Sequence, residues 1–159
     1  MTPERFEDGT PMLLAGVRRR HAFAIAERGI AEQWREFLAA PQIPDRIGST
    51  YYGVMCGSDD TTLEYMCGVE VQSFAALSAD AGRMRVPAQR YAVFSHPKGA
   101  ALAATWQQIL QWLTVGPYES AHKPDFEQYS RSPIEMSGSG EVLIWVGVVE
   151  RSASSAVGA

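Results

Sequence analysis

The chain has 159 residues, of which 46% are hydrophobic and 20% are charged, and its formal net charge is −4. This length and composition are typical of one globular domain with a packed core, and they exclude a disordered chain. No apolar run approaches the roughly 20 residues that a membrane helix needs, and the acidic balance argues against direct binding of nucleic acid.

The N-terminal segment and the number of cysteines indicate the cellular compartment of the protein. The segment from Met1 to Asp8 lacks the basic and then apolar regions of a signal peptide. Two cysteines, Cys56 and Cys67, are too few for a disulfide framework and would lie apart along a hairpin. We therefore expect a cytoplasmic protein with two free thiols.

The first half of the chain predicts a strand, a helix and a hairpin. After a polar lead-in, an apolar run at residues 12–17 indicates a short buried strand. In residues 26–39 the apolar side chains recur at helical spacing. The Tyr-rich segment 49–56 and the segment 63–71 flank turn-forming residues at 57–60, which predicts a hairpin.

The second half repeats this order. Residues 79–85 read as a loop or short connector, and residues 89–96 predict a strand. A helix is predicted over 102–113, followed by strands at 124–129 and 142–149. The sequence therefore contains the pattern strand, helix, strand, strand twice.

A βαββ unit cannot bury both faces of its own small sheet, so two copies should associate. We predict one α+β domain over residues 1–151, built from two units at about 10–72 and 88–150. The two helices would cover one face of an antiparallel sheet, and a groove between the halves would lie on the other face. A turn-rich linker at 137–140 would precede the last strand, and 152–159 would form a disordered tail.

Glu127 is a carboxylate in a segment where a strand would be apolar. Alternation along a strand places Glu127 and Tyr129 on one face, and Phe126 and Gln128 on the other. If the Glu127 face is solvated, the residue carries little information. If it faces a concave, aromatic-lined surface, it is a buried anion that a ligand or a hydrogen-bond donor must stabilise.

Aromatic side chains and one methionine are the other candidates for such a groove. Tyr51 and Tyr52 are adjacent, so alternation puts one of them on the groove face in either register. Trp145 lies in the last strand, next to the strand of Glu127, where it could form a wall. The remaining candidates, which core packing also explains, are Tyr65, Phe94, Trp106 and the adaptable Met66.

Metal and cofactor sites are not indicated. His21 and His96 each follow the first strand of a unit, and we expect structural roles for them. No spacing of His, Cys, Asp and Glu is typical of a metal site, and no phosphate-binding loop or nucleophilic serine motif is present. We expect no cofactor.

Four stretches stand out in their order along the chain. They are Tyr52-Gly53-Val54 with Glu64 to Val71; Tyr91 to His96; the helix from Trp106 to Trp112 with Gly116-Pro117-Tyr118-Glu119; and Pro124 to Tyr129 with the final strand. Together they resemble the GyrI-like, or AraC-type effector-binding, domain over residues 10–150. The resemblance implies two βαββ units related by a pseudo-dyad with a ligand pocket between them. It also implies that Glu127 points into that pocket, and the match to the family pattern favours Tyr52 over Tyr51.

Members of this family include ligand-binding domains of transcription regulators, DNA gyrase inhibitory proteins and hydrolases of cyclopropane-bearing genotoxins. The repeat leaves no room for a helix-turn-helix segment, so the chain resembles a stand-alone member. We predict a protein that binds small hydrophobic, cationic or amphipathic molecules. Glu127 would supply charge, and Tyr52, Trp106 and Trp145 would stack on the ligand.

Two alternatives stay open. In a hydrolase, Glu127 would activate water and Tyr52 would donate a proton to the leaving oxygen. In an inhibitor, the surface would contact a protein partner such as DNA gyrase, with the basic run Arg18 to Arg20 as one contact. An apolar sheet edge or an exposed helix would support an oligomer.

Overall fold

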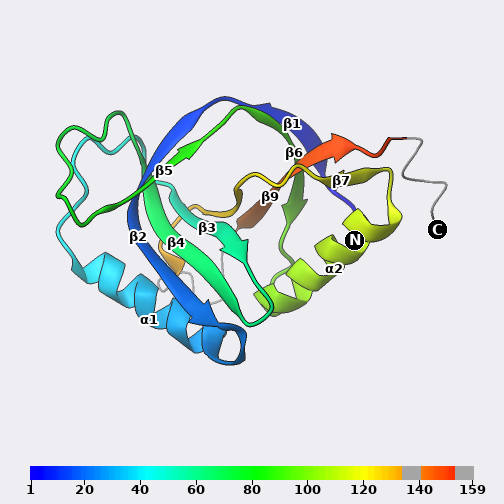
Figure 1. The fold of residues 1–159 in the computed structure, drawn as a ribbon, viewed down its shortest axis with the longest axis horizontal. Helices are drawn as coiled ribbons and strands as arrows, with labels where there is room; N and C mark the ends of the chain where they lie inside the picture. Colours follow the sequence, from blue (N-terminus) through cyan, green and yellow to red (C-terminus); the bar gives the residue numbers. More distant parts are fainter. Residues whose placement is uncertain (134–140, 153–159) are drawn as a thin grey trace.

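The computed structural model describes residues 1–133 and 141–152, and within these ranges the chain forms nine strands, two long helices and one short 3-10 helix (Figure 1). The predicted linker at 137–140 and most of the predicted tail lie outside the described residues. Neither long helix in the described ranges has the length and hydropathy needed to cross a lipid bilayer.

The order strand, helix, strand, strand occurs in both halves. The first half contains β1 Arg5–Gly9, β2 Met12–Ala22, η1 Phe23–Ile25, α1 Ala26–Ala39, β3 Tyr51–Ser58 and β4 Thr62–Val71. The second half contains β5 Gly82–Val86, β6 Gln89–Ser95, α2 Leu102–Val115, β7 Tyr118–Ser120, β8 Asp125–Tyr129 and β9 Val142–Glu150. The helices and the six strands of the predicted repeat are all present.

One antiparallel sheet joins the two halves. Its strand order is β1-β6-β9-β8-β3-β4-β2-β5, and β7 pairs with the far end of β9. The central pair is β3 and β8, so four strands lie on each side of the midline, and three of the four come from the same half. The α+β architecture with an antiparallel sheet is therefore confirmed.

The edge strands are exchanged between the halves. β1 precedes β2 in the chain but pairs with β6, while β5 precedes β6 but pairs with β2. Sequence patterning predicted a polar lead-in and a connector at these positions. Both segments are short and largely polar, so they lack the apolar alternation from which a strand is recognised.

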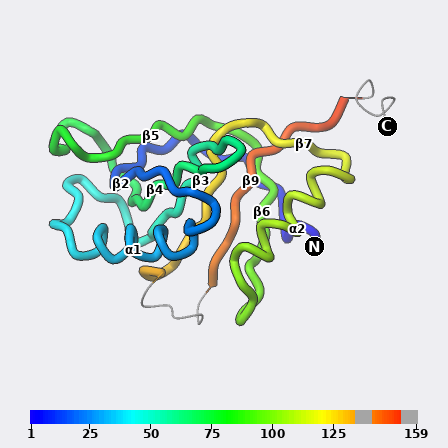
Figure 2. The backbone as a smooth tube through the Cα atoms, turned by 60° about the horizontal axis from the view of Figure 1, so that its bottom comes forward, coloured from blue at the N-terminus to red at the C-terminus, as the bar shows by residue number. Residues whose placement is uncertain are grey.

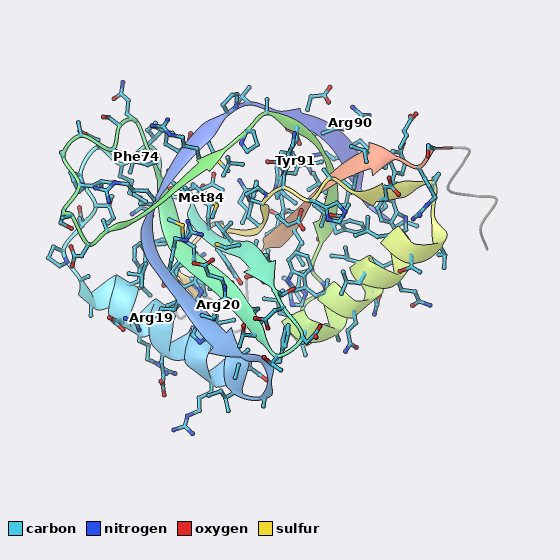
Figure 3. The ribbon with its side chains drawn as sticks, in the orientation of Figure 1. Arg19, Arg20, Phe74, Met84, Arg90 and Tyr91 are labelled. Carbon is cyan, nitrogen blue, oxygen red and sulfur yellow. The ribbon has the colours of Figure 1, made fainter. Side chains whose placement is uncertain are left out.

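The two faces of the sheet carry different cores. The sheet curls strongly, and α1 and α2 pack on its outer side, one over each half (Figures 1 and 2). Under α1 lies a cluster that includes Trp34, Tyr65 and Tyr129, and under α2 lies one that includes Phe94 and Ile109. The inner side is filled by a third cluster, to which the labelled Tyr91 belongs and against which the labelled Met84 packs (Figure 3).

Candidate functional site

Glu127 lies in β8 at the centre of the sheet, where the two halves meet. It pairs with Gly53 of β3 on one side and with Ile144 of β9 on the other. Its side chain points to the face that carries the helices, whereas the predicted groove was on the opposite face. The prediction of the side was wrong, because alternation determines which residues share a face but not which face the helices cover.

Three neutral donors hold the Glu127 carboxylate, which is only 1% exposed. The Tyr65 hydroxyl donates to Oε1 at 2.8 Å, and the Tyr129 hydroxyl donates to the same oxygen at 3.1 Å. The Trp106 indole Nε1–H of α2 donates to Oε2 at 3.0 Å. The indole of Trp34, in α1, donates to the Tyr65 hydroxyl at 3.1 Å, so both helices contribute an indole to this network.

Gly53 leaves the space through which the Tyr65 hydroxyl reaches the carboxylate. A Cβ atom at this position would lie 1.9 Å from Tyr65 Oη and 2.7 Å from Glu127 Oε1. Both distances are far below van der Waals contact, so any larger residue would displace the hydrogen-bonded pair. The glycine is therefore part of the site although it has no functional group.

Burial and hydrogen bonding act in opposite directions on Glu127. Burial raises the pKa of its carboxyl above the ordinary value, while the bonds from Trp106, Tyr65 and Tyr129 oppose that rise. Among the described residues, no Lys, Arg or His forms an ion pair with Glu127. The site thus combines a buried acid with aromatic neighbours, and no cationic side chain of the described residues pairs with that acid.

Four predicted residues besides Glu127 lie on the helix-bearing face, but only two of them touch the carboxylate. Tyr65 and Trp106 are its direct donors. Tyr51 pairs with Tyr129 in the sheet, and its ring lies 6.2 Å from that of Trp34. Phe94 is fully buried under α2 in the cluster that also contains Ile109.

Three predicted residues lie on the inner side of the curled sheet, away from the carboxylate. Tyr52 pairs with Gln128 and Trp145 pairs with Phe126, so both occupy the face opposite to Glu127. Met66 belongs to the same inner cluster. The expectation that these side chains form the wall of a groove together with Glu127 was wrong. Through the strand pairing, each lies level with a direct neighbour of Glu127 in β8, and neighbours along a strand point to opposite faces.

The inner cluster is a packed aromatic core. The rings of Trp145 and Phe126 stack at 5.7 Å, and Trp145 Nε1–H donates to Gln128 Oε1 at 2.9 Å. Tyr91 meets both Phe126 and Trp145 edge to face at 5.4 Å. These contacts show how large aromatic residues fill the inner side, and the Arg5 guanidinium lies over the Trp145 ring at 5.5 Å.

Comparison with known proteins identifies the family. The family model described as integron-associated effector binding protein, Cass2, matches residues 8–148, nearly the whole chain. The chain belongs to this family. It is thereby a member of the GyrI-like superfamily, as the sequence resemblance implied. No protein in the curated set is matched by this sequence.

Solved structures share the fold of this effector-binding family member. An integron cassette protein from the mobile metagenome of Vibrio cholerae is 20% identical, with a TM-score of 0.67 over 91% of this chain and 95% of that one. The protein SAV2435, solved bound to tetraphenylphosphonium, is also 20% identical, with a TM-score of 0.65 over 91% and 93% of the two chains. The C-terminal domain of EcmrR is 12% identical, with a TM-score of 0.65 over 92% and 97%.

Two site residues of this effector-binding fold were not among the predicted set. Tyr129 shares the Glu127 face by simple alternation, and this signal was visible in the sequence. Trp34 shares a helix face with Phe37, a pattern that indicates only core packing. Its link to Glu127 through Tyr65 depends on a contact between residues 31 positions apart, which no local pattern encodes.

A second acid lies in the same strand. Asp125 accepts a hydrogen bond from the backbone N–H of Gly147 at 2.8 Å. Burial raises the pKa of its carboxyl to about 7, and the Gly147 bond opposes that rise. Asp125 therefore ties the start of β8 to β9.

The basic run on β2 is engaged within the chain. Arg18 pairs with Glu64, Arg19 with Glu36 of α1, and Arg20 lies 3.6 Å from an oxygen of Asp59 (Arg19 and Arg20 are labelled in Figure 3). These contacts tie neighbouring strands and the helix together at the exposed end of the hairpin. They account for the basic run without an external partner.

The remaining chemistry of the described residues is unremarkable. Cys56 and Cys67 are free thiols, as predicted, and burial raises the pKa of Cys56 to about 11. In the described ranges, no group of three His, Cys, Asp or Glu side chains is placed to hold a metal ion. A shallow hollow of about 600 Å³ beside η1 and the start of α1 is lined by none of the site residues named above.

Proposed function

We propose that this chain binds lipophilic organic cations, with Glu127 as the counter-charge. The observation that carries the proposal is the buried carboxylate, whose partners among the described residues are all neutral. An ionised carboxylate held only by phenol and indole donors keeps its full negative charge in a medium of low dielectric constant. A cation that reaches it replaces the missing counter-ion.

The side chains around the carboxylate suit a cation with aromatic or apolar substituents. Trp106, Tyr65, Tyr129 and Trp34 place aromatic rings on both sides of Glu127. Each well-placed ring contributes about 0.5–2 kcal/mol to the binding of a cation. A strongly hydrated ion such as Na⁺ gains less here, because this site offers few oxygens to replace its water shell.

Trp106 controls access to the charge. Oε1 is engaged by two hydroxyls from the sheet, whereas Oε2 is covered by the Trp106 indole, which is only half-buried. Trp106 belongs to α2, and α2 buries two residues, Thr105 and Ile109, where α1 of equal length buries four. We infer that a ligand enters by displacing this indole, which then stacks against it.

A fold neighbour adds support. SAV2435, whose structure holds tetraphenylphosphonium, has the same fold at 20% identity. Tetraphenylphosphonium is a lipophilic cation of the class that a buried carboxylate among aromatic rings would select. It is therefore a suitable probe for the present chain.

The test compares wild type with Glu127→Gln, titrated with tetraphenylphosphonium and with the neutral analogue triphenylphosphine oxide by isothermal calorimetry. Loss of the charge should weaken binding of the cation by roughly 10- to 100-fold, the range expected for an interaction with a charged group. Binding of the neutral analogue should change less than about threefold. Equal affinity of both proteins for the cation, or no binding by wild type, would overturn the proposal.

The hydrolase alternative loses its predicted partner residue. Tyr52 lies on the opposite face of the sheet from Glu127 and cannot share a substrate with it. The hydroxyls beside the acid are those of Tyr65 and Tyr129, and each already donates a hydrogen bond to Glu127. Nothing in this arrangement favours water activation over binding of a cation.

A further inference from the structure

Each helix presents a buried polar residue directly before the tryptophan that serves the Glu127 network. In α1 the pair is Gln33 and Trp34, and in α2 it is Thr105 and Trp106. Gln33 and Thr105 are two of the four polar residues that the described chain buries almost completely. Both positions would be apolar if they served only to pack a helix on a sheet.

A histidine from the end of the strand that precedes each helix meets each of these polar side chains, His21 in β2 and His96 directly after β6. His21 Nε2 lies 2.7 Å from Gln33 Oε1, and His96 Nδ1 lies 2.8 Å from the Thr105 hydroxyl. The two histidines were expected to be structural. Their equivalent placement shows that the two halves repeat a side-chain arrangement as well as a fold.

The attachment of α1 is the firmer of the two. Gln33 Nε2 donates to the carbonyl of Val17 at 2.8 Å and to the carbonyl of Tyr65 at 3.0 Å. Gln33 thus ties α1 to β2 and β4 beside the residue that bonds Glu127. Trp34 follows it and reaches the Tyr65 hydroxyl.

Apart from the bond of Trp106 to Glu127 itself, the contact between His96 and Thr105 is the one described side-chain hydrogen bond that ties this part of α2 to the rest of the chain. His96 is held on β9 by its backbone N–H, which donates to the carbonyl of Val142 at 2.9 Å. Its ring meets the hydroxyl of Thr105, a residue that is 1% exposed. The backbone N–H of Thr105 is taken up in the first turn of the helix by Ala101. The Thr105 hydroxyl is therefore the polar tie between the sheet and the turn from which the Trp106 indole extends.

We infer that Thr105, held by His96, is a positioning residue that keeps Trp106 closed over Glu127 and thereby lowers the affinity of the site for cations. This inference rests on the proposed function. The protein exists as closed and open forms, and a ligand that binds only the open form has an apparent affinity reduced by the fraction that is open. A hydrogen bond present only in the closed form shifts that fraction by roughly two- to tenfold.

The direction of the expected effect is opposite to that of an ordinary structural defect. Thr105→Val keeps the shape of the side chain but removes the hydroxyl. It should tighten the binding of tetraphenylphosphonium by roughly two- to tenfold, because the open form becomes more populated. A residue that only stabilised the fold would leave the affinity unchanged or weaken it.

Two further variants complete the binding experiment. Thr105→Ser restores the hydroxyl and should return the affinity to that of wild type. Thr114→Val makes the same change in the same helix, where the hydroxyl bonds only the carbonyl of Leu110, and should have no effect. An unchanged or weaker affinity of Thr105→Val, or failure of Thr105→Ser to restore the wild-type value, would overturn the inference.

A measurement without ligand separates this inference from the proposed function. Hydrogen exchange of the Trp106 indole N–H can be followed by NMR on ¹⁵N-labelled protein, with Trp106→Phe to assign the signal. Thr105→Val should accelerate this exchange by roughly two- to tenfold, and Thr114→Val should not. If wild type fails to bind the cation, the proposed function fails while this result still decides the role of Thr105. Equal exchange rates in wild type and Thr105→Val would refute that role.

Discussion

Replacing Glu127 by Gln should remove part of the pH dependence of the free energy of unfolding. Burial raises the pKa of Glu127 in the folded protein, and the unfolded chain has an ordinary value of about 4.3. Between these two values the folded state binds more protons than the unfolded state, so stability falls as the pH rises. One proton corresponds to a slope of up to about 1.4 kcal/mol per pH unit.

The Gln variant lacks this slope because its amide does not titrate. It keeps the shape of the side chain, and the hydroxyls of Tyr65 and Tyr129 can rotate toward the amide, so about one hydrogen bond is lost. That loss costs roughly 0.5–1.5 kcal/mol at pH 5. As the pH rises from about 4.3 through the raised pKa of the folded carboxyl, the variant should gain on wild type. Function and stability would then place opposite demands on residue 127.

Urea unfolding at pH 5, 6, 7 and 8, followed by tryptophan fluorescence, measures the effect. Glu150→Gln is the matched control, since Glu150 is an exposed carboxylate at the end of β9. The control should parallel wild type across the series. The reasoning fails if Glu127→Gln also parallels wild type, or if it loses ground as the pH rises.

Three further predictions follow from the same geometry. Gly53→Ala should cost about 1–3 kcal/mol in urea unfolding because its Cβ meets the Tyr65 hydroxyl, and the cost should shrink in a Tyr65→Phe background; an equal cost in both backgrounds would contradict this. Tyr52→Phe should leave the Kd for tetraphenylphosphonium within about twofold, since Tyr52 lies on the opposite face from Glu127; a tenfold change would place it in the site. Asp125→Asn should be as stable as wild type at pH 5 and more stable at pH 8, by about 2–3 kcal/mol, because the raised pKa of about 7 makes the stability of wild type fall as the pH rises from 5 to that value; equal unfolding midpoints at pH 8 would show that Asp125 is better solvated than its burial implies.

Periodicity predicted the main elements because each of them is amphipathic. Helix α1 runs from Ala26 to Ala39 as expected. The strands of the repeat lie at the predicted positions, but β2 continues to Ala22, beyond the predicted end at residue 17. β1 and β5 were missed because an edge strand made largely of polar residues has no apolar alternation.

The candidate site was predicted in part. Alternation along β8 correctly placed Glu127 with Tyr129 and apart from Phe126. It could not place Tyr52 or Trp145, because their faces depend on strand pairings between residues far apart in the chain. The registers of β3 and β9 against β8 decide these faces, and both registers put the two aromatic residues on the inner side.

The sequence by itself determined the repeated pattern, the family resemblance and the unusual acid at Glu127. Each of these is local, since it rests on residue order and on the periodicity of a single element. The tertiary structure decided which face the acid occupies and which side chains reach it. Trp34 and Trp106 come from helices in different halves. Trp106 bonds Glu127 directly and Trp34 reaches it through Tyr65, and the two join one network only because the sheet pairs β3 with β8. Contacts of this kind are long-range products of packing, and no periodicity within one element encodes them.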